Sequence, residues 1–352
     1  MAMSLLLLRK SRVIWGKFVC HNEQVQSFQP NPIANLNDEL AYQKAILGSV
    51  SRTFALTIPL LPPAIEIVVG NTYLLCRIVD TIEDAANLTP ESKQALSKLF
   101  LDAVLEKTLV QSFVEPCLQA LKGYGNQDEL DLISNTPTVL KILHTCSPQD
   151  QVAVSRCVSI MSEGMSSFHG KQTQSGLKDL KEFEQYCYVV AGVVGELLTT
   201  VFSHHSAQFA NNFSGQNHLA IDFGQALQMT NILKDSPEDR ARGVSWKPAG
   251  YSQAALLQIA YLKLESSLRY ILLIPKKDIG IRQFCFLAFG LSVMTLSKIA
   301  KREQFLQKDD VKLSRKTVMA FYYFTKLAVH SDVLMKLFFQ ISSATLRKIS
   351  AA

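Results

Sequence analysis

The sequence predicts an all-α protein built as one bundle of helices. From about residue 38 onward, apolar residues recur with a period near 3.6, and helix-length runs alternate with short breaks. Strand signals are weak, because the chain has no Asn-Gly hairpin turn and no long alternation of apolar and polar residues. Hydrophobic residues make up 48% of the 352 residues, which is enough for a large core. We therefore expect about eight to ten helices around a central cavity.

Turn-forming residues indicate where the helices begin and end. Pro62 and Pro63 can occupy the first turn of one helix, and Thr89 followed by Pro90 is typical of a capping residue before another. No internal repeat divides the chain, so a single domain accounts for the helical pattern. The expected breaks between helices fall at residues 59–63, 88–92, 123–127, 146–150, 172–178, 206–217, 235–251 and 275–280.

The two ends of the chain differ from its middle. Residues 1–37 show no helical period, so we expect a poorly ordered or loosely docked extension before a single domain at 38–352. The four leucines near the N-terminus precede the charges, which is not the pattern of a signal peptide. No run of about eighteen uncharged apolar residues occurs, so we predict no transmembrane helix. Residues 334–349 are amphipathic, and a packing helix is favoured over a helix on a membrane surface.

Charge and cysteine content argue against several classes of protein. Lys and Arg exceed Asp and Glu by only 36 to 30, and no basic run with interleaved aromatic residues indicates nucleic-acid binding. That excess suits an anionic substrate or a loose approach to an anionic membrane. The seven cysteines include no Cys-x-x-Cys pair, which argues against a disulfide framework or a zinc site. We expect a cytoplasmic protein, with peripheral membrane contact left open and a monomer favoured.

The first segment that carries chemistry is an acidic cluster inside an apolar helical run. Asp80, Glu83 and Asp84 occupy positions i, i+3 and i+4, which lie on one side of a helix. Such close carboxylates repel each other unless cations neutralise them. Hard oxygen ligands at this spacing suit Mg²⁺, which keeps phosphate oxygens and waters in its other sites. Taken alone, such a cluster is more often a solvated acidic patch.

A second cluster follows about 150 residues later. Asn231, Asp235 and either Glu238 or Asp239 recur at i, i+4 and either i+7 or i+8. Two such helices facing each other across a bundle could hold a diphosphate through Mg²⁺ and let an allylic carbocation form. The alternative is a helix start, because Ser236 and Pro237 resemble a capping box with Asp239. A helix that restarts at Pro237 would not place Asp235 and Asp239 on one face.

Several segments, in order along the chain, resemble the squalene/phytoene synthase family. Residues 51–54 are similar to the family's Ser-Arg-Thr-Phe entry segment, and Arg77 stands where the family has an arginine beside its first acidic motif. Residues 186–196 resemble its Tyr-Cys-x-x-Val-Ala-Gly-x-Val-Gly segment, and residues 227–235 its second motif. Residues 281–285 and 311–315 are more similar to the squalene synthase branch than to the carotenoid branch. The resemblance implies the isoprenoid synthase fold.

The resemblance also implies a role for matching side chains. Tyr186 would face the cavity near the departing diphosphate, placed for proton transfer or cation stabilisation. Phe54 and Tyr73 fit aromatic walls that shield a carbocation, with plain core packing as an equal alternative. The metal ligands expected from the two motifs are Asp80, Glu83, Asp84, Asn231, Asp235 and Asp239, and the aspartates among them are counted as catalytic with Tyr186. The expected substrate contacts are Ser51, Arg52, Phe54, Tyr73, Arg77, Gln228, Asn231, Lys312 and Arg315.

Some positions depart from the family pattern or lie beside it. Val244 stands where the family has an arginine, although Arg240 and Arg242 are near enough to substitute, and Lys234 replaces a common arginine. His169 lies among polar residues, so a surface loop or helix end is the favoured interpretation. The glycines of the Tyr-Cys segment are expected at close helix–helix contacts or beside a prenyl chain: Gly192 and Gly195.

Of three functions considered, we predict the first, because residues 281–285 and 311–315 are more similar to the squalene synthase branch. A squalene synthase would condense two farnesyl diphosphates head-to-head with Mg²⁺ and reduce the product with NADPH. A phytoene or dehydrosqualene synthase would make the same type of intermediate but lose a proton in place of accepting hydride. A non-catalytic helical factor on this fold would tend to lose the acidic motifs, so the retention of both clusters argues against it.

Overall fold

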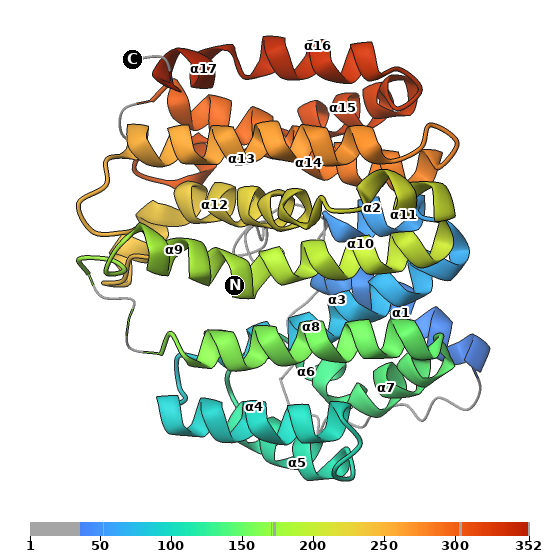
Figure 1. Ribbon diagram of the computed structural model, residues 1–352. Helices are drawn as coiled ribbons and strands as arrows, with labels where there is room; N and C mark the ends of the chain where they lie inside the picture. Colours follow the sequence, from blue (N-terminus) through green and yellow to red (C-terminus); the bar gives the residue numbers. More distant parts are fainter. Residues whose placement is uncertain (1–35, 52, 170, 172–173, 303–304, 351–352) are drawn as a thin grey trace, which may run out of the picture.

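The protein is a bundle of helices (Figure 1). The computed structural model describes residues 36–51, 53–169, 171, 174–302 and 305–350. Across these ranges the regular elements are all helical, and a single isolated parallel bridge joins Leu177 to Pro248. The prediction of an all-α fold is therefore confirmed. Most of the expected N-terminal extension, and the substrate residue Arg52, lie outside the described residues.

The helices are more numerous than the sequence predicted, because several are short. One of them, α11, falls inside the expected break at 206–217. The elements, in chain order, are α1 Leu36–Val50, α2 Phe54–Thr57, η2 Ile58–Leu60, α3 Pro63–Asp84, α4 Pro90–Val104, α5 Gln111–Ala120, α6 Gln127–Ser134, α7 Thr136–Thr145, α8 Pro148–Ser166, α9 Leu180–Cys187, η3 Tyr188–Gly192, α10 Val193–His205, α11 Ala207–Phe213, α12 Asn217–Ala241, α13 Gln253–Leu273, α14 Ile279–Ala300, η4 Lys308–Asp310, α15 Arg315–Ala328, α16 Asp332–Ser342 and α17 Ala344–Ser350.

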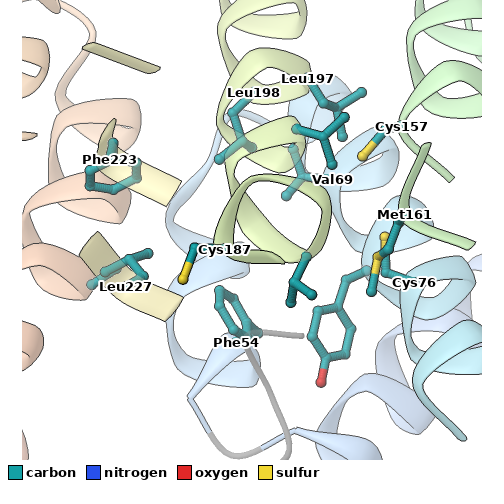
Figure 2. Packing of buried hydrophobic residues seen from close by; sticks show 14 of the residues in the cluster. Phe54, Val69, Cys76, Cys157, Met161, Cys187, Leu197, Leu198, Phe223 and Leu227 are labelled. Atoms are coloured by element: carbon teal, nitrogen blue, oxygen red, sulfur yellow. The ribbon is translucent and has the colours of Figure 1, made fainter. Parts of the chain in front are cut away.

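The long helices stack in layers across the bundle. In Figure 1, α8 lies between the small helices α4 to α7 and the rod formed by α9, η3 and α10, with α12, α13 and α14 above that rod and α16 along the upper edge. Helix α3 packs on α1, α7 and α8, while α12 packs on α10, α13 and α14. Figure 2 shows where these layers meet, with apolar side chains from α3, α8, α10 and α12 gathered around Phe54.

Two helical spans are long and apolar enough to cross a membrane, Leu180–His205 and Ile279–Ala300. Their apolar windows are 72% and 78% buried inside the protein. Both spans lie in the middle of the bundle, so core packing accounts for their composition. The first span contains η3, a five-residue π-helical turn that interrupts the α-helical ladder directly after Tyr186 and Cys187.

Helices α10 and α12 touch backbone to backbone. A Cβ atom on Gly195 would lie 2.0 Å from the carbonyl oxygen of Ala220, and a Cβ on Gly224 would lie 2.0 Å from that of Ala191. Only glycine fits at both positions, so the expectation of close helix contact at Gly195 is confirmed. This contact fixes the rod that carries Tyr186 directly against the helix that carries the second acidic motif.

Helix α12 does not restart at Pro237, so that interpretation of the sequence is wrong. The helix runs unbroken to Ala241. A proline inside a helix leaves the carbonyl four residues earlier without its amide partner. Here that carbonyl belongs to Leu233, and the Ser236 hydroxyl donates to it at 3.0 Å. The side chain thus replaces the missing backbone bond, and Asp235 and Asp239 share a face after all.

Candidate active site

Two facing helices carry polar stripes that end near their C-termini. Each stripe keeps to one face because its members follow at spacings of three or four residues. On α3 the stripe consists of Tyr73, Arg77, Asp80 and Asp84. On α12 it consists of Gln228, Asn231, Asp235 and Asp239.

The two stripes converge on Tyr186. Burial raises the pKa of Asp239, and the negative charge of Asp84 on α3 adds to this, against the opposing effect of Arg242. Burial also raises the pKa of Tyr186 well above its usual value, and the carboxylates of Asp84, Asp80 and Asp239 each raise it further. Aspartates of both acidic motifs therefore act electrostatically on the same tyrosine hydroxyl.

Tyr186 sits in an aromatic enclosure. Its ring stacks on Trp246 with centroids 4.1 Å apart and planes 10° apart, and Phe168 meets it edge-on at 5.2 Å. Tyr186 is only 2% exposed. Motif matching missed both neighbours, because neither belongs to an acidic segment. The one signal for Trp246 is its place shortly after Gly243, a glycine that can end a helix.

The end of α12 explains how Trp246 reaches Tyr186. Gly243 adopts φ +75°, its amide donates to Arg240, and the amide of Val244 donates to Asp239 at 3.0 Å. This pair of bonds is a Schellman motif, which reverses the chain direction and needs a left-handed residue. The following connector is held to the loop after α8 by bonds of 2.9 and 2.8 Å between Leu177 and residues 247 and 249.

Some charged residues of the stripes already have protein partners. Arg77 pairs with Glu129, the residue that also closes the capping box of α6. Its Nε and Nη1 atoms are buried and have no hydrogen-bond partner among the described residues. Asp239 pairs with Arg242, which supplies a cation near the position where Val244 departs from the family pattern. The Lys234 amine lies 3.9 Å from Asp235 and donates to Asn231 at 3.5 Å.

The structure places Glu83 apart from the stripe on α3. Its carboxylate pairs with His169 and accepts hydrogen bonds from Ser166 at 3.2 Å and Ser97 at 3.4 Å. The physical reason is the helical step of about 100° per residue, which turns Glu83 about 60° from Asp80 on the side opposite to Arg77 and Asp84, toward α4 and α8. Glu83 therefore fastens three helices, which argues against the metal-ligand role expected from spacing. His169 lies just beyond the end of α8, as its neighbours in sequence indicated.

An apolar cavity extends inward from Asp80. Its volume is about 40 Å³, and the expected wall residues Phe54 and Tyr73 line it with ring centroids 5.2 Å apart. The other lining residues are Ile58, Val69, Thr72, Cys76, Val194, Leu197, Leu198 and Phe284. Since one water molecule takes about 30 Å³ in the liquid, a prenyl chain would have to displace these side chains to enter. Ser51 does not line the cavity, but its hydroxyl accepts a hydrogen bond from the amide of the lining residue Phe54 at 3.0 Å.

Lys312 and Arg315 line a separate groove of about 640 Å³, together with Lys298 and Lys301. The groove lies between the C-terminal end of α14 and the start of α15. Helix α13 follows the acidic end of α12 in the chain. Gln253 at the start of α13 donates to the carbonyl of Arg302, just after α14, at 3.0 Å, and this bond ties the two regions together. The Lys312 amine lies 3.3 Å from Asp309. The structure thus gathers four cations in the groove without bringing them into contact with the two stripes.

The acidic residues fit a magnesium ion that is shared with a ligand. Within the described ranges, no three acidic, histidine or cysteine side chains converge as a complete metal site. Mg²⁺ needs no such cage, because it is bound by one or two carboxylates with phosphate oxygens and waters completing its shell. The Oδ2 atom of Asp84 is buried and accepts no hydrogen bond from a described residue. A carboxylate oxygen that lacks a hydrogen-bond partner and lies near the charges of Asp80 and Asp239 is stabilised when a cation binds beside it.

Comparison with known proteins places this site in context. The model of the squalene/phytoene synthase family matches residues 47–256. The chain belongs to the squalene/phytoene synthase family. Both acidic motifs and Tyr186 fall within the match, whereas Lys312 and Arg315 lie beyond it.

The family's curated members that match this chain include several squalene synthases. Botryococcus squalene synthase of Botryococcus braunii is 32% identical over 200 residues, covering 57% of this chain and 40% of the relative. Squalene synthase of Eremothecium gossypii is 27% identical over 287 residues, covering 74% and 62%. Squalene synthase ERG9 of Saccharomyces cerevisiae is 26% identical over 342 residues, covering 84% and 74%. The chain thus spans 40% and 62% of the length of the first two of these family members.

A solved structure of TcSQS in complex with the ligand E5700 has the same fold. It superposes with a TM-score of 0.71 at 20% identity, covering 89% of this chain and 96% of that one. The expected isoprenoid synthase fold of the squalene/phytoene synthase family is therefore confirmed.

Proposed function

We propose that this protein is a squalene synthase that condenses two farnesyl diphosphates head-to-head and reduces the product with NADPH. The observation that carries the proposal is the convergence of the two acidic stripes on the buried hydroxyl of Tyr186. The squalene synthases among its relatives support the same activity.

Asp80 and Asp84 on α3, with Asp235 and Asp239 on α12, would hold Mg²⁺ together with the substrate diphosphates. The ion supplies positive charge that offsets the charge of the leaving diphosphate. Asn231 and Gln228 on the same face of α12 would orient the diphosphate oxygens. Arg77 supports this role, since two of its buried nitrogens bond to no described residue and can donate to a ligand.

Tyr186 would act next to the departing diphosphate. Its raised pKa keeps the hydroxyl protonated, so it donates a hydrogen bond to the diphosphate. The released diphosphate can then accept a proton through that hydroxyl as the cyclopropane ring closes. Trp246 and Phe168 keep water away from this step and present ring faces that stabilise a nearby cation. The cavity between Phe54 and Phe284 would open to take the prenyl chain.

NADPH would supply the hydride of the second step. The groove with Lys298, Lys301, Lys312 and Arg315 fits the phosphates of a dinucleotide, because it collects cations in a volume of about 640 Å³. Of these four cations, Lys312 and Arg315 are the two that the resemblance to the family implies as substrate contacts.

Product analysis tests the proposal. Purified protein incubated with farnesyl diphosphate, Mg²⁺ and saturating NADPH should give squalene as the main product, and excess chelator should stop turnover. Dehydrosqualene or phytoene, unchanged by the cofactor, would assign the chain to the carotenoid branch. No condensation at all would overturn the proposal.

A variant separates the two steps. Lys312→Ala should raise the KM for NADPH about tenfold or leave presqualene diphosphate unreduced, while the first condensation continues. Lys98→Ala, on the exposed surface of α4, is the matched control and should change neither step. An unaltered reductive step in Lys312→Ala would remove the basic groove from the mechanism.

A further inference from the structure

The helical hairpin formed by α15 and α16 exposes an unusual amount of apolar surface. Six of the fifteen large hydrophobic residues that are exposed in the described ranges lie within residues 315–342. On α16 they follow one another at helical spacing, with Val333 71%, Leu337 46% and Ile341 68% exposed. On α15, Tyr323 is 60% and Leu327 70% exposed. We name these five residues, with Leu334, the outer apolar face.

The outer apolar face is additional to a packed inner face. Met335 and Phe339 on α16 are buried against the bundle, and Phe338 of α16 packs on Phe321 of α15 with ring centroids 4.7 Å apart. Because both helices already have complete inward packing, the exposed row is not needed for the core. Helix α16 forms the upper edge of the molecule in Figure 1, so its outer side is open to a large partner.

The net positive charge of the chain lies in its C-terminal segment, which includes this face. Residues 311–352 contain seven Lys or Arg and one Asp, while the preceding 310 residues contain 29 Lys or Arg and 29 Asp or Glu. The full net charge of +6 therefore resides in the last 42 residues. The one aspartate, Asp332, is paired with Arg282 and Lys276. Lys326 and Lys336 flank the outer apolar face, and the Lys326 amine lies over the Tyr323 ring at 5.5 Å.

We propose that the α15–α16 hairpin docks on the surface of a membrane that contains anionic phospholipid. Apolar side chains between flanking lysines match the two layers that such a surface offers, acyl chains below and anionic headgroups above. Tyr323 with Lys326 beside it suits the boundary between them. Docking here is peripheral, since both helices remain packed on α14. The amphipathic character of residues 334–349 thus serves both packing and docking, whereas the sequence alone favoured packing.

A second copy of the chain fits this face less well. Two hairpins meeting face to face would bring their excess positive charges together without an acidic surface to offset them. The anionic bilayer offers the opposite charge, which is why we choose it as the occupant.

Vesicle sedimentation tests the docking with the full chain. Vesicles with about 30% phosphatidylserine in phosphatidylcholine should bind the protein, and pure phosphatidylcholine should bind it at least tenfold more weakly. The triple variant Val333→Ser, Leu337→Ser and Ile341→Ser should lose binding at least tenfold. The double variant Lys326→Gln and Lys336→Gln should lose about twentyfold on the anionic vesicles, with little change on the neutral ones.

Matched controls make the outcome decisive. Val152→Ser on α8, where the valine is 70% exposed, and Leu109→Ser, where the leucine is 81% exposed, should bind as the parent does. Unchanged circular dichroism and condensation activity would show that each variant is folded. No binding of the parent to anionic vesicles overturns the proposal. Self-association in solution that the triple variant abolishes would assign the face to a second copy instead.

Discussion

Two buried arginines, Arg77 and Arg282, differ in how many of their donors the protein satisfies. Arg282 of α14 is 1% exposed, and its guanidinium donates to the carbonyls of Val329 and Ile274 at 2.9 and 2.6 Å and pairs with Asp332 at 2.5 Å. Arg77 of α3 is 6% exposed and pairs with Glu129, while its Nε and Nη1 atoms bond to no described residue.

The two arginines differ in how far the protein itself satisfies their donors. A buried cation is costly unless its donors are satisfied, and each guanidinium nitrogen of Arg282 has a partner, from two backbone carbonyls and the Asp332 carboxylate. Arg77 and Asp84 instead keep buried atoms that bond to no described residue, Nε and Nη1 of the arginine and Oδ2 of the aspartate. Such atoms can bond to an added ligand that carries both cations and oxygens, as a magnesium diphosphate does.

The largest effect should come from the shared metal site. Asp80→Asn should lower turnover about a thousandfold or more without unfolding the protein, because one metal ligand is worth several kcal/mol in the transition state. Steady-state kinetics and a thermal melt measure the two quantities. Glu83→Gln, on the same helix but paired with His169, should lower turnover less than tenfold. Equal losses of turnover in Asp80→Asn and Glu83→Gln would contradict the different roles assigned to Asp80 and Glu83.

Removal of the Arg282 guanidinium should lower the stability of the protein. Arg282→Met should lower the free energy of unfolding by about 3 kcal/mol, because Asp332 and two backbone carbonyls lose their partner. Urea denaturation measures the change. Lys276→Met removes an exposed partner of the same aspartate and should cost less than about 0.5 kcal/mol. A small effect of Arg282→Met would mean that water replaces the guanidinium.

Tyr186→Phe should slow formation of the cyclopropyl intermediate about a hundredfold while binding of farnesyl diphosphate changes little. Single-turnover kinetics separate the two. The control is Tyr270→Phe, which removes an equally buried hydroxyl that lies 3.0 Å from Thr199, away from both motifs. That variant should lose stability and keep its rate. Matching rates for Tyr186→Phe and the parent would leave Tyr186 a packing residue.

The smallest expected effect is an increase in the free energy of unfolding. Asp84→Asn should stabilise the metal-free protein by about 1 kcal/mol, because it removes a negative charge close to Asp80 and Asp239, on a carboxylate whose Oδ2 atom is buried without a described hydrogen-bond partner. Addition of Mg²⁺ with inorganic pyrophosphate should stabilise the parent more than the variant. Denaturation with and without these additions provides the measurement, and a destabilised Asp84→Asn would mean that the carboxylate has a structural partner.

Sequence patterns predicted the fold and the two stripes well, because both depend on local periodicity. The helical spacing of Asp80 and Asp84, and of Gln228 and Asn231, needs no knowledge of the rest of the chain. Close contact at Gly195 was also predictable. The partner positions, Gly224 and Ala220, were not, because pairing between distant helices leaves no local signal.

The errors have the same origin. Pro237 indicated a helix start, since the sequence does not show that the Ser236 hydroxyl takes over the Leu233 carbonyl. The pairing of Glu83 with His169 was not expected, because the two residues lie 86 positions apart in sequence. Trp246 was missed, since its stacking on Tyr186 depends on the chain reversal at Gly243.

The replacement of a backbone bond at Pro237 has an evolutionary consequence. Without Ser236, the proline would leave the Leu233 carbonyl bare two residues away from Asp235. Without Pro237, the amide of the new residue would supply the missing bond, and the serine hydroxyl would no longer be needed for it. Ser236 and Pro237 thus form a coupled pair, and related chains should retain both or exchange both together.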